Sequence, residues 1–295
     1  MNKPKVIVIC GPTASGKTAL SIELAKKIDG EIISCDSMQI YKDMNIGTAK
    51  VTKSEMQGIK HYLVDFVSPD TRYSVADYKT DAEKAIENII SKGKIPIIVG
   101  GTGLYVDSLI YGIEYPEIKF DEEYRKKLEK EAEEGLENLY NKAKEIDEQA
   151  MQKISINDRK RIIRVLEIYH ATGKNKTEQE KESRKKEVKY DYKIFAINIR
   201  VDKMIENGLI EEVENLRRKY NHFPTAMQGL GYKEVVQYFQ KELTKEEMIE
   251  KIKQESRRYA KRQLTWFRKN KQTIWIDGLA NLEDNINIIE KELNK

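Results

Sequence analysis

GPTASGKT, at residues 11–18, directly follows an apolar run at residues 6–10. This octapeptide has the spacing of a phosphate-binding loop, in which two glycines let the backbone turn tightly and successive N–H groups point inward. The amphipathic helix expected at residues 19–27 directs its positive N-terminus at the same anion. The chain therefore begins with the strand, loop and helix of an α/β protein that binds phosphate.

The side chains of this loop also suit a phosphate chain. Lys17 adds a positive charge for terminal phosphates, and the Thr18 hydroxyl is a ligand for Mg²⁺. An ordinary glycine-rich turn between a strand and a helix is the alternative. The predicted diphosphate- or nucleotide-binding residues are Gly11, Pro12, Thr13, Ala14, Ser15, Gly16, Lys17 and Thr18, with Thr18 as the metal ligand.

The alternation of apolar and helical stretches predicts the fold class. From residue 5 to about 113, short apolar runs alternate with helical patterns, which is typical of a parallel α/β sheet. Strands are expected at 6–10, 31–35 and 95–99, and helices at 19–27 and 75–91. We predict an α/β protein: a P-loop NTPase-like parallel sheet flanked by helices, with an all-helical insertion domain.

Three regions follow from the pattern. Residues 1–113 form the first part of the core, 114–190 the helical insertion, and 191–295 return to the core and end in helices. The insertion separates its charges, because residues 114–150 carry seven basic and thirteen acidic side chains whereas 151–190 carry twelve and six. The second half is therefore expected to face an anionic partner.

The composition limits the possible classes of protein. The net charge is only +4 although 35% of the 295 residues are charged, so the overall charge does not indicate a nucleic-acid partner. The apolar runs are too short to cross a bilayer, and the N-terminus lacks a signal-peptide pattern. Cys10 and Cys35 each end an apolar run, which is typical of buried thiols in a reducing cytoplasm. The three histidines lack metal-ligand spacing, so no zinc site is expected.

A polar cluster follows the predicted strand at residues 31–35, at the edge where active sites of parallel sheets lie. The carboxylate of Asp36 could bind Mg²⁺ or accept a proton there. Capping of the next turn through its own backbone is the alternative role for Asp36. Ser37 and Gln39 are suited to contact a base edge or a substrate hydroxyl.

A glycine-rich turn, GGTG at residues 100–103, ends another predicted strand. Three glycines in four residues mean that the backbone passes close to other atoms, and a ligand is the favoured interpretation. Thr102 has the only side-chain hydroxyl in this turn, and its alternative role is the N-cap of a helix. This strand ends in glycine where most ATP or GTP hydrolases carry a metal-organising acid, so a GTPase is not expected.

Two basic stretches could contact an anionic partner. Residues 257–271 contain seven basic and no acidic side chains, interleaved with the aromatic residues Tyr259, Trp266 and Phe267. This composition suits a nucleic-acid backbone, although helical spacing favours a core position for the aromatic side chains. A second basic cluster, at residues 160–164, lies beside an apolar face, and a solvated helix surface is its alternative.

Six ordered motifs connect the chain to a known family. They are GPTASGKT at 11–18, DSMQIYKDMNIGTAK at 36–50, PIIVGGTGLY at 96–105, NDRKRIIRVLEIYHATGK at 157–174, GLGYKE at 229–234 and KRQLTWFRK at 261–269. Over nearly its whole length the chain resembles the bacterial tRNA dimethylallyltransferases, also called tRNA isopentenyltransferases. The resemblance implies transfer of a dimethylallyl group from dimethylallyl diphosphate to N6 of the adenosine 3′ of the anticodon, in tRNAs reading codons that begin with U. The loop would then hold the diphosphate leaving group, with Mg²⁺ on Thr18.

The resemblance also implies roles for individual residues. Asp36 would be the general base on the adenine amine, Lys17 would stabilise the diphosphate, and Thr102 and Arg125 would address the substrate or diphosphate across a channel. The insertion would clamp the anticodon stem, and the protein would be a cytoplasmic monomer. The residues implied to contact tRNA are Asp36, Ser37, Met38, Gln39, Lys160, Arg161, Ile162, Ile163, Arg164, Gln228, Gly231, Tyr232, Lys233, Lys261, Arg262, Gln263, Thr265, Trp266 and Arg268.

The chain departs from the family pattern at residues 199–201, where the connection is shorter than is usual. Three other functions stay open. A small-molecule or nucleoside kinase could use the same loop and Asp36, but it leaves the basic stretches unexplained. A noncatalytic RNA-binding protein would leave Asp36 and Thr102 unused, and prenylation of free adenine nucleotides would leave the helical insertion without a purpose.

Overall fold

The computed structural model describes residues 3–12, 15–115, 121–183, 187–198, 209–220, 227, 229–278 and 280–294. The chain divides into two compact units: unit 1 comprises Met1–Ile110 and Val188–Lys295, and unit 2 comprises Tyr111–Glu187. The sequence pattern sets the limits of the insertion at residues 114 and 190. Within the described ranges, no helix combines the length and the apolar character needed to cross a membrane.

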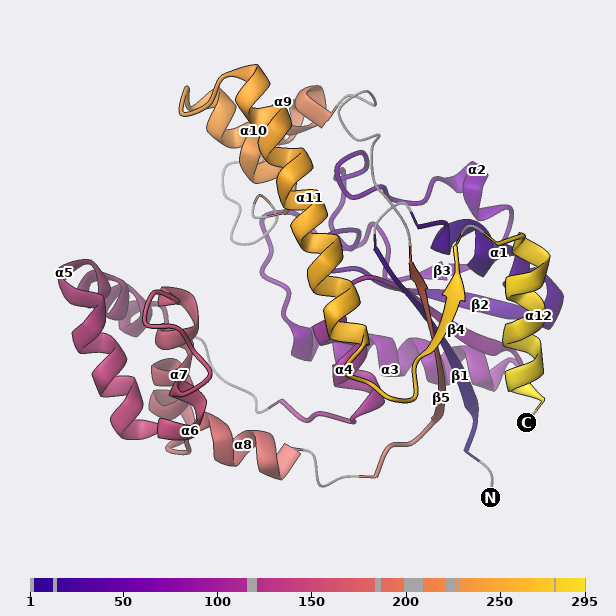
Figure 1. Ribbon diagram of the computed structural model, residues 1–295, viewed down its shortest axis with the longest axis horizontal. Coiled ribbons are helices and arrows are strands. Elements are labelled where there is room, and N and C mark those ends of the chain that lie inside the picture. The colour runs from indigo at the N-terminus through magenta and orange to yellow at the C-terminus, as the bar shows by residue number, and fades with distance from the viewer. Residues whose placement is uncertain are drawn as a thin grey trace. The chain divides into compact units, whose positions relative to one another are not determined.

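Unit 1 is built on a parallel sheet of six strands in the order β3-β2-β4-β1-β5-β6 (Figure 1). The strands are β1 (Lys5–Cys10), β2 (Gly30–Cys35), β3 (His61–Tyr62), β4 (Ile95–Gly100), β5 (Asp191–Asn198) and β6 (Ile274–Asp277). The predicted parallel α/β sheet is confirmed. Residues 6–10 of β1 are at most 1% exposed, because a parallel strand covered on both faces is apolar throughout. The short β3 was not predicted, since two residues leave no apolar pattern.

Helices cover both faces of this sheet. α1 (Lys17–Ile28) and α12 (Leu282–Leu293) pack on one face, and α3 (Val75–Ser91) and α4 (Gly103–Ile110) pack on the other (Figure 1). Successive side chains of β1 alternate between the two apolar clusters, as the pleat of a strand requires. The short α2 (Lys53–Met56) follows β2 and precedes β3.

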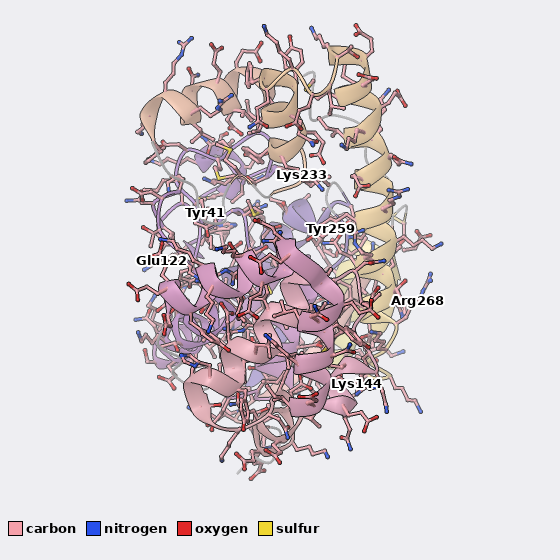
Figure 2. The ribbon with its side chains drawn as sticks, turned by 90° about the vertical axis from the view of Figure 1, so that its left-hand side faces the viewer. Tyr41, Glu122, Lys144, Lys233, Tyr259 and Arg268 are labelled. Carbon is pink, nitrogen blue, oxygen red and sulfur yellow. The ribbon has the colours of Figure 1, made fainter. Side chains whose placement is uncertain are left out.

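Three further helices lie beyond the sheet and enclose the segment that follows β2. They are α9 (Leu209–Lys219), α10 (Tyr232–Phe239) and α11 (Lys245–Phe267), and α11 begins at a capping box formed by Thr244 and Glu247. Tyr41, labelled in Figure 2, is fully buried in the apolar cluster that this segment forms with the three helices. The C-terminal helices therefore support the segment that carries Asp36 and Gln39.

Residues 121–183 of unit 2 form helices joined by short turns. Its helices are α5 (Glu122–Ile146), α6 (Glu148–Met151), α7 (Arg159–Thr172) and α8 (Lys176–Ser183). α5 is interrupted at Gly135, whose backbone is not helical. Buried apolar side chains of α5, α6 and α7 form a core of their own, and the Asp147 carboxylate joins α6 to α8 by accepting hydrogen bonds from Thr177.

Candidate active site

Three strand ends lie in register at one edge of the sheet in unit 1. Cys10, at the end of β1, and Cys35, at the end of β2, both align with Gly100 at the end of β4. The three polar segments that follow these strands therefore begin at the same level of the sheet. This is the edge at which parallel α/β sheets hold their ligands.

The phosphate-binding loop requires glycine at two positions. Gly11 has a φ of +154°, and a Cβ there would lie 2.6 Å from the carbonyl oxygen of Ile197. Gly16 has a φ of +83° and directly precedes α1. Both backbone conformations are strained for residues with a side chain. The loop thus brings the N-terminus of α1 to the end of β1.

The charged and hydroxyl groups of the loop are placed to meet an anion. The Lys17 ammonium donates a hydrogen bond of 2.5 Å to the carbonyl oxygen of Pro12, so it lies over the loop's own backbone. Ser15 is buried, and its hydroxyl has no hydrogen-bond partner within the described residues. Thr18 is exposed at the start of α1. The predicted loop residues Thr13 and Ala14 lie outside the described residues.

Lys17 and Asp36 are both half-buried and interact electrostatically. Burial lowers the pKa of Lys17 to about 8, although the negative charge of Asp36 opposes this effect. Burial raises the pKa of Asp36, while the backbone N–H of Met38, the charge of Lys17 and the N–H of Gln39 act in the opposite direction. A buried carboxylate with a raised pKa is a stronger base than one in water, which suits it to accept a proton.

The two proposed roles of Asp36 are compatible. Its Oδ1 accepts hydrogen bonds from the backbone N–H groups of Met38 (2.9 Å) and Gln39 (3.3 Å), so the predicted turn cap is present. The other oxygen, Oδ2, has no hydrogen-bond partner in the described part of the chain. One oxygen therefore fixes the carboxylate, and the second is available for a substrate.

Thr102 connects two of the converging segments. Its hydroxyl oxygen accepts a hydrogen bond of 3.0 Å from the Ser37 N–H and lies 3.3 Å from the Ser37 hydroxyl. Its N–H donates to the carbonyl oxygen of Cys35. The hydroxyl thus joins the ends of β2 and β4 and does not serve as a helix N-cap.

Gln39 has a fixed orientation beside this connection. Its side-chain N–H groups donate to the carbonyl oxygens of Thr48 (3.1 Å) and Ala49 (3.2 Å). Because both donors point to the protein, the side-chain oxygen is the group left for a ligand. Gln39 can therefore accept a hydrogen bond from an amine but has no free side-chain N–H to offer.

The glycine-rich turn at residues 100–103 corrects the expectation that a ligand comes close to its backbone. A Cβ on Gly100 would lie 2.0 Å from the carbonyl oxygen of Cys35. A Cβ on Gly101 or Gly103 would lie 2.2 Å from the side-chain nitrogen of Gln263 or 2.5 Å from the ring of Trp266, respectively. These glycines make room for the protein's own atoms, because β2 and α11 pack directly against the turn.

Tyr259 is a site residue whose position the sequence analysis missed. The side chain of Thr102 forms a hydrogen bond with Tyr259, whose pKa burial raises to about 12 with a further contribution from Asp36. The sequence identified Tyr259 only as an aromatic residue of a basic stretch. Its spacing from Gln263 and Trp266, four and seven residues, was the available signal, because these positions share one helix face.

α11 has a buried side and an exposed basic side. Gln263 is buried and donates a hydrogen bond of 2.7 Å to the carbonyl oxygen of Gly101, and Phe267 is buried in the main core. Trp266 is partly buried against the same core. The expected core position of the aromatic residues is thereby confirmed for Phe267. The predicted tRNA-contacting residues exposed on α11 are Lys261, Arg262, Thr265 and Arg268, the last labelled in Figure 2.

Most of the predicted tRNA-contacting residues at the start of α10 make their contacts within the protein. Tyr232 is fully buried, and its hydroxyl donates a hydrogen bond of 2.6 Å to Glu212. Gly231 has a φ of +90° and donates its N–H to Glu234. Lys233, labelled in Figure 2, is the exposed side chain of this group. Gln228 lies outside the described residues.

In unit 2, the predicted tRNA-contacting residues divide into surface and core. Lys160 and Arg161 are exposed at the start of α7, and Arg164 is partly exposed. Ile162 and Ile163 are at most 1% exposed and belong to the core of the unit. The side chains of these two isoleucines are therefore not available at this surface, and they hold α7 against α5.

Arg125, predicted to act in catalysis, is held by two carboxylates of unit 2. Its guanidinium lies 2.9 Å from Glu129 and 3.0 Å from Glu167. Arg164 lies 3.3 Å from the same Glu167. The charge of Arg125 is thus compensated within its own unit, and its catalytic role stays a prediction.

The fold and the loop together define the class of this protein. A six-stranded parallel sheet with a glycine-rich loop, Lys17 and a helix N-terminus at one strand end is a P-loop NTPase-like structure. Residues 39–270 match the family model described as IPP transferase, and the chain belongs to this family. The resemblance found in the sequence motifs is confirmed.

Relatives and solved structures agree with this membership. A protein of Acetivibrio thermocellus named tRNA dimethylallyltransferase is 52% identical over 92% of this chain and 91% of its own length. The tRNA delta(2)-isopentenylpyrophosphate transferase of Staphylococcus epidermidis has a TM-score of 0.70 at 39% identity, with 99% of both chains covered. A eukaryotic dimethylallyltransferase acting on tRNA has a TM-score of 0.77 at 32% identity, covering 93% of this chain and 74% of that one.

Proposed function

We propose that the protein transfers a dimethylallyl group from dimethylallyl diphosphate to N6 of the adenosine 3′ of the anticodon, in tRNAs reading codons that begin with U. Diphosphate is the second product. The names of the relatives support this reaction, and one structural observation carries it: the half-buried Lys17 of the phosphate-binding loop interacts electrostatically with the half-buried Asp36 at the same edge of the sheet, and the pKa of Asp36 is raised. An anion-binding group and a base thus share one site.

The donor side of the reaction uses the loop. The bond between the allylic carbon and the diphosphate oxygen breaks, and negative charge develops on the diphosphate. Lys17, the loop N–H groups and the N-terminus of α1 stabilise this charge. The unpartnered Ser15 hydroxyl is a further group that fits an anion.

A bound Mg²⁺ would be held by the Thr18 hydroxyl and by phosphate oxygens of the donor, where it would neutralise charge on the leaving group. The described residues contain no group of three or more His, Cys, Asp or Glu side chains that could enclose a metal ion. Such a group is not required, since Mg²⁺ commonly keeps several waters and takes its other ligands from the substrate.

The acceptor side uses the segment after β2. The adenine N6 forms a bond to the allylic carbon, and the N6 proton passes to Oδ2 of Asp36. Gln39, oriented by its bonds to Thr48 and Ala49, would accept a hydrogen bond from the nucleotide, and Ser37 would contribute its hydroxyl. The target base must leave its stack in the tRNA to reach Asp36 and Gln39.

Two surfaces are proposed to contact the tRNA backbone, one in each unit. In unit 1 the exposed residues of α11 are Lys261, Arg262, Thr265 and Arg268. In unit 2 they are Lys160, Arg161 and Arg164 at the start of α7, and this unit would clamp the anticodon stem. Basic side chains in these positions would supply the salt-dependent part of tRNA affinity. The enzyme would act as a monomer in the cytoplasm, where its substrate is found.

The test is transfer of labelled dimethylallyl from its diphosphate to unmodified tRNA with Mg²⁺, run beside AMP as acceptor and ATP as competing donor. Label on tRNA alone is the expected result. Label on AMP alone would retain the core chemistry and overturn the tRNA assignment. Transfer of phosphate from ATP would make the protein a kinase.

A further inference from the structure

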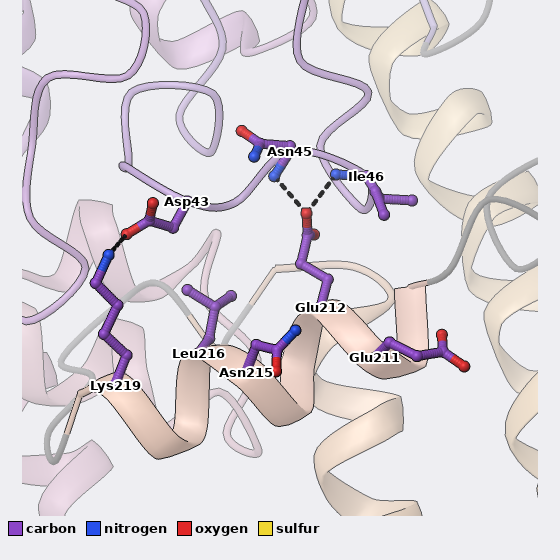
Figure 3. A pocket seen from close by; sticks show the side chains of 8 residues that line it. All are labelled: Asp43, Asn45, Ile46, Glu211, Glu212, Asn215, Leu216 and Lys219. Carbon is purple, nitrogen blue, oxygen red and sulfur yellow. Dashed lines mark hydrogen bonds and ion pairs between the residues drawn. The ribbon is translucent and has the colours of Figure 1, made fainter.

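A buried carboxylate holds the turn that follows Gln39 in the chain. Three successive backbone N–H groups of this turn donate to Glu212 of α9. Those of Asn45 and Ile46 donate to Oε2, each at 2.7 Å (Figure 3). That of Gly47 donates to Oε1 at 3.2 Å. Charge-assisted hydrogen bonds of this kind are stronger than those between neutral groups. The three N–H groups of the turn therefore surround the Glu212 carboxylate in the way that backbone N–H groups surround a bound anion.

Hydrogen bonds from the protein itself occupy both oxygens of the Glu212 carboxylate. Its Oε1 also accepts a hydrogen bond of 2.6 Å from the Tyr232 hydroxyl, and the residue is only 9% exposed. No lysine or arginine of the described residues forms an ion pair with it. A buried carboxylate is costly unless hydrogen bonds compensate it, so these four donors stabilise Glu212, and the charge of Lys50 adds a favourable electrostatic interaction without direct contact.

The turn also packs against α9, because Met44 is fully buried and Ile46 is partly buried in the apolar cluster that contains Val213 and Leu216 of α9. A cavity of about 540 Å³ lies between them, lined by residues of both segments including Asn45 and Glu212 (Figure 3). Beside the cavity, Lys219 forms an ion pair of 2.6 Å with Asp43. Apolar packing and the hydrogen bonds to Glu212 therefore hold the turn against α9 together, and the hydrogen bonds are the directional contacts that set the orientation of its backbone.

The held turn is the same one that orients Gln39. Residues 45–47 donate their N–H groups to Glu212, and the next two residues, Thr48 and Ala49, present their carbonyl oxygens to the Gln39 side chain. Hydrogen bonds from Lys50 N–H to the Asn45 carbonyl and from the Thr48 hydroxyl to Met44 make the turn a compact unit. A shift at the Glu212 contact would therefore move the carbonyl groups that fix Gln39.

We propose that Glu212 is a positioning residue for the acceptor site: through the turn at residues 44–50 it sets the orientation in which Gln39 receives the target nucleotide. The inference rests on the proposed function, because it assigns Gln39 to the nucleotide. A carboxylate is required at this position, since both of its oxygens accept hydrogen bonds and an amide would turn N–H groups toward the same donors.

The test compares Glu212→Gln with Glu211→Gln, a matched change at the neighbouring exposed residue that also lines the cavity. For Glu212→Gln we expect the KM for tRNA to rise about tenfold, since displaced binding groups cost on the order of one to two powers of ten. The KM for dimethylallyl diphosphate should stay unchanged, and Glu211→Gln should leave both values unchanged. A merely structural role would instead lower the fraction of active protein and leave both KM values as they are.

A double-mutant cycle with Gln39→Ala tests whether Glu212 acts through Gln39. If it does, Glu212→Gln should add less than about a twofold effect on the KM for tRNA in the Gln39→Ala background, because effects transmitted through one group are not additive. Fully additive effects would overturn the proposal. If Glu212→Gln does not fold, Tyr232→Phe replaces it as the test variant, because it removes one of the four donors. It should raise the KM for tRNA by a smaller factor.

Hydrogen exchange at the amides of residues 45–47 separates this proposal from the proposed function. Glu212→Gln should accelerate exchange at these amides in the absence of any substrate, and Glu211→Gln should not. If exchange at these amides is unchanged, Glu212 does not hold the turn, and the proposal is overturned even if the protein modifies tRNA. If exchange is accelerated but the protein does not modify tRNA, Glu212 holds the turn and the proposed function is rejected.

Discussion

Two glycine-rich turns follow neighbouring strands of the sheet, and glycine has a different purpose in each. The difference lies at Gly16 of the loop after β1, where a Cβ would meet no atom within 4 Å and glycine is needed for the φ of +83°, whereas Gly11 at the start of that loop lies close to the Ile197 carbonyl oxygen. In the turn after β4, Gly100, Gly101 and Gly103 are needed because β2 and α11 occupy the space of a side chain. The space beside Gly16 in the first turn is open, and the space beside the glycines of the second turn is filled by the protein.

The difference shows what a run of glycines in a sequence does and does not indicate. In both turns the glycines indicate that the backbone adopts an unusual conformation or lies close to other atoms. A helix follows each turn, but only the first turn has a lysine directly after its glycine, and this local context favours an anion as the ligand. In the second turn, the atoms that come close belong to residues distant in the chain.

The largest expected effect concerns the chemistry that the first turn serves. We expect Asp36→Ala to reduce turnover about a thousandfold, since a general base contributes roughly 10²- to 10⁴-fold. The affinity for dimethylallyl diphosphate should change little, because Lys17 and the loop bind the donor. Single-turnover transfer and calorimetric donor binding at about pH 6.5, below the lowered pKa of Lys17, measure the two quantities. Equal losses in both would contradict the role of Asp36 as a base.

The comparison of the two turns is tested directly by Gly100→Ala and Gly16→Ala. We expect Gly100→Ala to lower the free energy of unfolding by about 3 kcal/mol, because its Cβ would lie 2.0 Å from a backbone oxygen that cannot move without β2. Gly16→Ala should cost about 1 kcal/mol, from backbone strain alone. Urea unfolding of the two variants measures both values. Similar losses would show that the distinction between the turns is wrong.

The exposed side of α11 should behave differently from its buried side, which packs on the second turn. Replacing Lys261, Arg262 and Arg268 together by glutamine should weaken tRNA binding and reduce the slope of log K against log salt by about 2, since each phosphate contact contributes somewhat less than 1. Donor affinity should stay the same. Lys84→Gln, at an exposed lysine of α3, is the control. An unchanged salt slope would show that these residues do not contact phosphates.

The smallest expected effect is a pH dependence of the first turn. The pKa of Lys17 is about 8 in the free protein, and a bound diphosphate raises it by favouring the charged form. Donor binding therefore takes up a proton above pH 8, so its affinity should fall as pH rises, by at most about tenfold per pH unit. Calorimetric titration with dimethylallyl diphosphate between pH 7 and 9 measures this. Lys17→Arg, which stays charged, should show no such decline.

Much of the core of unit 1 could be predicted from the sequence. Buried parallel strands are apolar throughout, so β1, β2 and β4 appear as short apolar runs, and the phosphate-binding loop is a continuous segment whose function depends on neighbouring residues. Asp36 was found because it directly follows a strand. The apolar stretches at residues 192–199 and 273–276 also predict strands, and β5 and β6 begin and end within one residue of these bounds.

Other parts of the site could not be predicted from local patterns. Tyr259 meets Thr102, and Glu212 meets the turn at residues 45–47, across more than a hundred positions of the chain. A glutamate on an amphipathic helix is usually exposed, and nothing in its neighbours distinguishes Glu212 from Glu211. Helical spacing likewise placed the basic stretch of α11 on a surface but did not show which atoms its other face would touch.

The sequence by itself determined the local elements of this protein: the apolar strands, the phosphate-binding loop, the acidic residue after β2 and the basic stretch of α11. These depend on residues within one or two turns of each other. The tertiary structure decided what surrounds them. The contact of Gln263 with Gly101 joins residues 162 positions apart, and no local pattern encodes such a contact, because it exists only once the helix packs against the sheet.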